Sequence, residues 1–135
     1  MKRAVCAAIF LLFAAAPSRA EEPADRPAQA MGWYGGEYQA CGAKTSTPEI
    51  AGCINDLAAK WDQRLNTAYQ ALMTSQTPDQ KERLRIAERD WLQFRNANCD
   101  FYLNVQGTIA NIKYAECKRV LTAQRTIELE TEARP

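Results

Sequence analysis

Four cysteines constrain the fold of this chain more than any other feature of its sequence. They are Cys41, Cys53, Cys99 and Cys117; a fifth, Cys6, lies in an apolar leader segment. An even number of cysteines in a small exported domain is typical of a disulfide framework. Zinc sites use closely paired cysteines or histidines, whereas these cysteines are far apart and the chain has no histidine. The pattern predicts two disulfides and no metal site.

The first 20 residues have the pattern of a secretory signal peptide. Lys2 and Arg3 precede an apolar run from Ala4 to Ala16, and small residues lead to a cut after Ala20. The run is shorter than the roughly 20 residues of a membrane span, which disfavours an uncleaved anchor. We therefore expect a periplasmic or secreted protein whose mature chain contains no membrane span.

Removal of the leader would leave one small acidic domain of 115 residues (135 minus 20). Without Lys2, Arg3 and Arg19, the chain has 14 Lys and Arg against 16 Asp and Glu, a net charge of −2. This balance gives no basic field for nucleic acid and no patch for lipid head groups. We expect a protein partner, with no nucleic acid and no cofactor.

Two similar motifs predict the starts of helices. Residues 47–49 (Thr-Pro-Glu) and 77–79 (Thr-Pro-Asp) each combine a capping hydroxyl, an early proline and an acid near the positive end of the helix dipole. Apolar residues then recur every three or four positions, so the first helix should end near Met73 and the second near Leu103. The short link makes these two helices antiparallel neighbours.

A third helix is expected to follow Gly107 and Thr108, which act as a stop and a cap. No stretch alternates as a strand does. The predicted fold is all-α: a three-helix bundle, made of a helical hairpin plus a third helix, stapled by two disulfides. We divide the chain into a signal peptide (1–20), a flexible N-terminal arm without regular structure (21–40), the helical domain (41–130) and a disordered tail (131–135).

The segment from Arg85 to Cys99 is expected to be the central helix, because Trp91, Arg95 and Cys99 are four residues apart on one face. Trp91 should fill the space between the other two helices. The predicted core residues are Trp61, Leu65 and Trp91. The inner face of the central helix should also include Phe94, Asn98 and Phe101.

Helix levels favour the disulfide pairs Cys41–Cys99 and Cys53–Cys117. Cys99 ends the second helix at the level where Cys41 precedes the first, and the other two lie roughly 9 to 14 Å along their helices. Each bond would close a loop of about 60 residues, worth about 4 kcal/mol. The pairing Cys53–Cys99 with Cys41–Cys117 remains open.

Polar residues on the inner helix faces indicate an interhelical network rather than a catalytic site. The set is Asp62, Asn66, Tyr69, Arg95 and Arg125, with Asp62 and Arg125 near the same level. A buried charge must be paired, which explains why carboxylates and arginines would occur together. The commonest general base, histidine, is absent, and no phosphate loop or nucleophile elbow is present. We therefore predict no enzyme activity and no catalytic residue.

The spacing of these residues resembles the LprI-like lysozyme-inhibitor domain family. The matching positions run from Cys41 to Leu129: the four cysteines, Asp62-x-x-Leu65-Asn66-x-x-Tyr69, Trp91-x-x-x-Arg95-x-x-x-Cys99, and Thr122-x-x-Arg125. The chain departs from the family pattern at Glu88 and Asn96. The resemblance implies a helical, disulfide-linked fold, no catalysis, and inhibition of a lysozyme-type muramidase. A cell-envelope structural or adaptor protein with another periplasmic partner is the alternative.

Contacts with a partner are expected on loops, because rigid scaffolds commonly present function there. Two candidate segments lie at opposite ends of the helices, and an aromatic pair in the N-terminal arm is a third. The candidate contact residues are Met73, Thr74, Ser75, Gln76, Asn104, Gln106, Trp33 and Tyr34.

Overall fold

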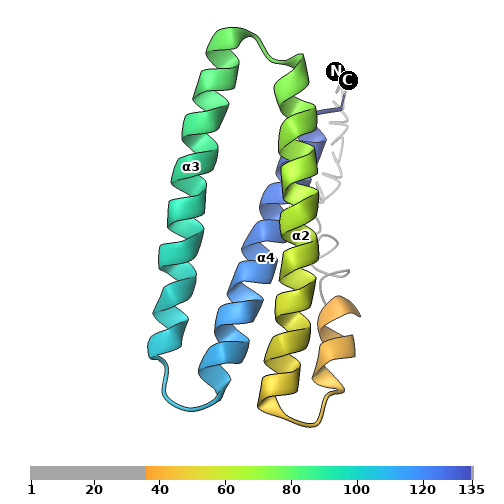
Figure 1. The fold of residues 1–135 in the computed structure, drawn as a ribbon, viewed down its shortest axis with the longest axis vertical. Coiled ribbons are helices and arrows are strands. Elements are labelled where there is room, and N and C mark those ends of the chain that lie inside the picture. The colour runs from red at the N-terminus through yellow and green to blue at the C-terminus, as the bar shows by residue number, and fades with distance from the viewer. Residues whose placement is uncertain (1–35, 135) are drawn as a thin grey trace, which may run out of the picture.

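The fold is a bundle of three long helices, seen here in a computed structural model that describes residues 36–134. The elements are α2 (Thr47–Ser75), α3 (Pro78–Asp100), the 3₁₀ turn η1 (Phe101–Asn104) and α4 (Ile109–Glu132) (Figure 1). Residues 36–42 form a short helical segment before α2. The all-α prediction is confirmed. The expected signal peptide and the aromatic pair Trp33 and Tyr34 lie outside the described residues.

The predicted helix starts occur within one residue of their expected positions. Ser46, rather than Thr47, caps α2: its backbone N–H donates to the Glu49 carboxylate at 3.1 Å, and its hydroxyl accepts from the Glu49 N–H. Thr77 caps α3 in the same reciprocal way with Gln80. The left-handed φ of Gly107, 87°, explains why glycine ends the chain reversal before α4.

The apolar core lies between α2 and α4. Three clusters of buried side chains follow this contact, and each one combines residues of both helices; they contain Ile54 with Ile112, Trp61 with Ala123, and Leu65 with Leu129. Most buried residues of α4 are small or polar (Ala110, Ala115, Thr122, Ala123 and Thr126). Small side chains allow the two helix backbones to approach closely, so α2 and α4 form the central pair of the bundle.

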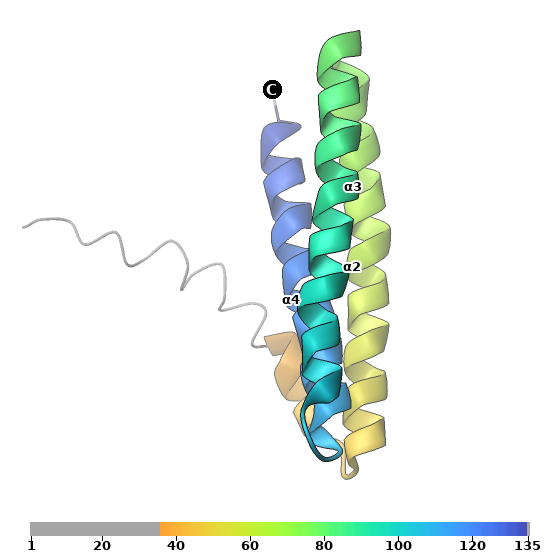
Figure 2. The same cartoon turned by 90° about the vertical axis from the view of Figure 1, so that its left-hand side faces the viewer.

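Helix α3 is therefore not the central helix that its sequence predicts. Its buried residues are Glu88, Arg95 and Cys99, so charged groups and a cystine attach it to the α2–α4 pair. Trp91 is only half-buried, against the cluster that contains Leu65 and Leu129. Figure 2 shows α3 nearest the viewer along the length of the bundle.

Phe94 and Phe101, assigned to the inner face of the second helix, point outward instead, whereas Asn98 donates to Cys117 Sγ on α4 at 3.3 Å. Phe94 is 55% exposed, Phe101 is 67% exposed, and Asn98 is exposed as well. The apolar repeat therefore predicts the wrong inner face for this helix. The stripe that faces the bundle carries Glu88 and Arg95.

The disulfides join Cys41 to Cys53 and Cys99 to Cys117. The favoured pairs Cys41–Cys99 and Cys53–Cys117 are wrong, as is the alternative pairing. The residues before α2 do not extend away from it as an arm. They form a helical turn that folds back against the start of α2, so Cys41 meets Cys53 only 12 residues later.

The helical segment 36–42 also corrects the expectation of no regular structure up to residue 40. It docks through Glu37, whose carboxylate accepts from the Trp61 indole N–H at 3.0 Å and from Arg119 at 3.1 Å. At the other end of the domain, α4 continues to Glu132, past the predicted start of the tail.

Candidate functional site

The predicted polar network is centred on Arg95, which joins all three long helices. Its Nη1 donates to Asp62 on α2 at 2.8 Å and to the Thr122 hydroxyl on α4 at 3.0 Å. The Arg95 side chain is 9% exposed, and its Cζ lies 5.2 Å from the centroid of the Trp91 ring. Its Nε–H is buried without a hydrogen-bond partner among the described residues. Arg95 thus fixes the position of α3 across the bundle.

Arg125 belongs to a second ion pair and not to the first. Its Nε donates to Glu88 on α3 at 3.0 Å, and its Nη1 lies 2.9 Å from Glu128. Burial alone would lower the pKa of the Arg125 guanidinium, but hydrogen bonds to Glu128 and Glu88 raise it overall. The expected proximity of Asp62 and Arg125 at one level therefore does not produce a pair. Glu88 supplies the carboxylate instead.

Asn66 and Tyr69, the other predicted network residues, line a groove between α2 and α3. Neither forms a side-chain hydrogen bond to another described residue. The groove is a hollow of about 430 Å³. A smaller hollow of about 330 Å³, lined by α2 and by Tyr114 and Lys118 of α4, adjoins it at the Asp62–Arg95 ion pair. Asn66 and Tyr69 both open into the larger hollow. The structure thus brings Asp62, Asn66, Tyr69 and Arg95 together in the lining of one groove.

A buried cluster around Arg119 was missed by the sequence analysis. Arg119 is 1% exposed, and its guanidinium forms two hydrogen bonds with Glu116 and one with Glu37. Hydrogen bonding to Glu116 is the main reason that the pKa of Arg119 is raised despite burial. Its spacing from Ile112, Ala115 and Thr122 places it on the buried stripe of α4, and this periodicity could have predicted it.

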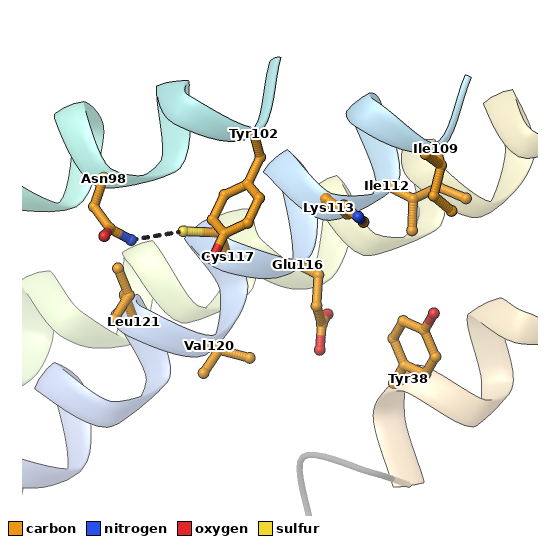
Figure 3. A pocket seen from close by; sticks show the side chains of 10 residues that line it. All are labelled: Tyr38, Asn98, Tyr102, Ile109, Ile112, Lys113, Glu116, Cys117, Val120 and Leu121. Atoms are coloured by element: carbon orange, nitrogen blue, oxygen red, sulfur yellow. Dashed lines mark hydrogen bonds between the residues drawn. The ribbon is translucent and has the colours of Figure 1, made fainter. Parts of the chain in front are cut away.

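A second groove, mainly apolar and about 570 Å³ in volume, follows α4 and is bordered by the 36–42 segment and by the residues around the end of α3. Figure 3 shows Tyr38 on one side of it and Asn98 and Tyr102 on the other, with Val120 and Leu121 of α4 between them. Its acid, Glu116, is already bound to Arg119. This groove suits an apolar side chain rather than acid–base chemistry.

The predicted loop contacts lie at opposite ends of the bundle (Figure 1). Met73, Thr74 and Ser75 end α2, and Gln76 caps it. Asn104 ends η1, and Gln106 lies in the turn before α4. None of them contacts the groove between α2 and α3.

The arrangement can bind but offers no obvious acid–base pair. Within residues 36–134, no group of three or more histidine, cysteine or acidic side chains could hold a metal ion. The groove carboxylates Asp62 and Glu88 are each hydrogen-bonded to an arginine. No described helix is both long and apolar enough to cross a membrane.

The fold and the groove define a class: small all-helical domains with two disulfides between neighbouring segments and a polar groove crossed by an interhelical ion pair. Comparison with known families identifies the member of this class more closely. Residues 39–129 match the family described as Lysozyme inhibitor LprI, and the chain belongs to that family. No curated protein and no solved structure matches the chain.

Proposed function

We propose that this protein is an exported, non-catalytic inhibitor of a lysozyme-type muramidase. The observation that carries the proposal is the family match, which covers residues 39–129 and thus nearly all of the described domain. The two disulfides support export, because such bonds persist in oxidising compartments. A signal peptide cleaved after Ala20 would provide the route.

The rigidity of the domain supports a role as an inhibitor scaffold. Both disulfides, Cys41–Cys53 and Cys99–Cys117, fasten helix ends at the same end of the bundle (Figure 1). A binding surface that is already ordered loses little conformational entropy when it meets its target. Glycoside hydrolysis needs two carboxyl groups that face the substrate as acid and base. Asp62 and Glu88 are each bound to an arginine, which supports a binding role over hydrolysis.

A turbidity assay tests the proposal. Lysozyme clears a suspension of bacterial cells, and the oxidised protein should slow this clearance in proportion to its molar ratio to the enzyme. The same protein, reduced and alkylated, is the control and should lose the effect. No slowing at a large molar excess would reject the proposal for that enzyme.

A soluble oligosaccharide substrate distinguishes an inhibitor from a protein that shields the cell wall. An inhibitor slows hydrolysis of both substrates, because it acts on the enzyme. Slower lysis with unchanged hydrolysis of the soluble substrate would contradict inhibition. That result would instead favour the alternative function of an envelope adaptor, for which the apolar groove beside Tyr38 and Tyr102 would provide a contact surface.

A further inference from the structure

The groove between α2 and α3 has the dimensions of a site for a linear ligand. On α2, the residues that line this groove and the smaller hollow beside α4 that adjoins it extend from Asn55 to Gln70 along one stripe. Fifteen residues of α-helix span about 22 Å. The Asp62–Arg95 ion pair crosses the groove near its middle and joins its walls. A surface of this length, with a bridged floor, can contact several successive units of an extended chain.

The α2 wall presents hydrogen-bonding groups that the domain itself does not use. Asn66, Tyr69 and Gln70 open into the larger hollow, and none of these side chains is hydrogen-bonded to another described residue. A carboxamide has both donors and an acceptor, so Asn66 and Gln70 can each pair with the C=O and N–H of a peptide unit.

The charge that remains available in this hollow is positive. Its carboxylates, Asp62 and Glu88, are held by Arg95 and Arg125. By contrast, Arg85 and Arg89 on the α3 wall pair only with exposed acids outside the hollow, at 3.1 and 3.5 Å, and both arginines are more than half exposed. Exposed pairs of this kind contribute about 0–1 kcal/mol, so an incoming carboxylate can replace them.

The spacing of these groups matches an extended polypeptide. Arg85 and Arg89 are four residues apart on a helix, as are Asn66 and Gln70, which corresponds to a rise of about 6 Å. In an extended chain, alternate side chains and alternate peptide units repeat every 6.4 to 6.8 Å, roughly two residues. Both walls of the groove therefore offer groups at close to the two-residue repeat.

We propose that this groove binds an extended segment of a partner protein that carries acidic side chains at alternate positions. The segment's backbone pairs with Asn66 and Gln70, while two of its carboxylates contact Arg85 and Arg89. The proposal goes beyond muramidase inhibition and does not depend on it, because it concerns the chemistry of the bound segment and not the identity of the partner.

Titration of the isotope-labelled, oxidised protein by NMR tests the proposal. The probe is a peptide of about eight residues that alternates glutamate and alanine, which spans the groove when extended. Amide shifts should concentrate in residues 55–70 and 85–95. Replacement of every glutamate by glutamine should weaken binding at least about tenfold, since it removes two charge-assisted contacts.

Paired charge reversals distinguish the site from general attraction. Arg85→Glu with Arg89→Glu should weaken peptide binding by at least about tenfold. Arg83→Glu with Lys60→Glu makes the same change of net charge outside the hollow and should leave binding nearly unchanged. All four side chains are exposed, so the folded state should persist in both variants.

Several outcomes would overturn the proposal. Equal weakening by the two double variants would show attraction by net charge alone. Shifts outside the groove, or equal binding of the glutamate and glutamine peptides, would also contradict it. An acidic oligosaccharide that binds the same residues more tightly than the peptide would reassign the groove to a glycan.

Asn66→Ala with Gln70→Ala should weaken peptide binding while the helical circular dichroism is unchanged.

Discussion

Individual arginines of this domain attach one helix to another through hydrogen bonds, whereas most helix interfaces depend on apolar side chains. Arg95 reaches both neighbouring helices, and Arg125 reaches Glu88 across the α3–α4 contact. Removal of one member of a buried pair leaves the other charge without compensation, which is strongly destabilising. The residues that hold α3 are therefore expected to be sensitive to truncation although they contribute little apolar area.

Arg125→Ala should lower the free energy of unfolding by about 2–3 kcal/mol, because Glu88 would be left 12% exposed without its partner. Thermal or denaturant unfolding measures the change. Lys60→Ala is the surface control, expected to remain within about 0.5 kcal/mol of the native protein. A loss in the first variant no larger than in the control would contradict the network.

Trp91→Ala should cost about 2 kcal/mol, less than the 3–5 kcal/mol typical of a fully buried aromatic side chain. The reason is that Trp91 is half-buried and packs on one side only, against the Leu65 cluster and the Arg95 guanidinium. Trp61→Phe offers a comparison within the α2–α4 core, where the indole N–H also donates to Glu37. A loss above about 4 kcal/mol for Trp91→Ala would contradict this description and indicate a fully buried side chain.

At the scale of the elements, each disulfide fastens two segments that are neighbours along the chain. The loops they close are 12 and 18 residues long, so the chain-entropy contribution is about 3 kcal/mol for each bond. One bond fastens the 36–42 segment to α2, and the other fastens the end of α3 to α4. The second is the covalent counterpart of the ion pairs that attach α3.

Mapping of tryptic peptides without reduction tests the pairing directly. Bonds between Cys41 and Cys53 and between Cys99 and Cys117 should link the peptide ending at Lys44 to residues 45–60, and residues 96–113 to residues 114–118. A linked species that contains residues 45–60 and 114–118 would instead support the pairing predicted from helix levels.

Helices α2 and α4 are also joined at the surface by Arg64 and Glu130. The Arg64 guanidinium donates two hydrogen bonds to this carboxylate, at 2.6 and 2.7 Å, and they hold its pKa below the ordinary value of 4.5. A carboxyl group whose pKa is lowered in the folded state stabilises it above the unfolded pKa, and this stabilisation is lost as the pH falls through the folded value.

Glu130→Gln should therefore reduce stability modestly at neutral pH and flatten the loss of stability below about pH 4.5. Melting temperatures from pH 7 to pH 3 measure both effects. Glu132→Gln, on an exposed carboxylate nearby, is the control. If the two variants show the same pH dependence as each other, the Arg64–Glu130 pair makes no contribution.

Sequence patterns predicted the long elements well, because capping residues and prolines act locally. They did not predict the buried face of α4, because its residues are small. The buried face of α4 is built from Ala115, Thr122, Ala123 and Thr126, whereas a search for large apolar residues selects Val120 and Leu121. The stripe of Trp91, Arg95 and Cys99 likewise predicted a central α3, although the small-residue face of α4 packs against α2.

At the scale of the whole molecule, the candidate site could be predicted only in part. Asp62 and Arg95 were expected to share a network and do so, because their positions on α2 and α3 follow from helical periodicity. The distance between α3 and α2 decides which acid pairs with Arg125. It also decides whether Asn66 and Tyr69 open into a groove. That separation is a result of tertiary packing, which no local pattern encodes.

The molecule as a whole is thus an α2–α4 pair to which ion pairs and a disulfide attach α3. It has two grooves: a polar one beside Asp62 and Arg95, and an apolar one beside Tyr38 and Tyr102. A scaffold of this kind presents preformed surfaces to a partner, as expected of an inhibitor that binds without rearrangement.

Complex formation with lysozyme is the most direct test of this view. Calorimetric titration of the enzyme with the oxidised protein should give a saturable signal with a fixed stoichiometry, in the concentration range that slows lysis. The two proteins should also elute together from a sizing column. Absence of heat and of co-elution at a large molar excess would contradict the central claim that this LprI-family domain acts by binding the muramidase.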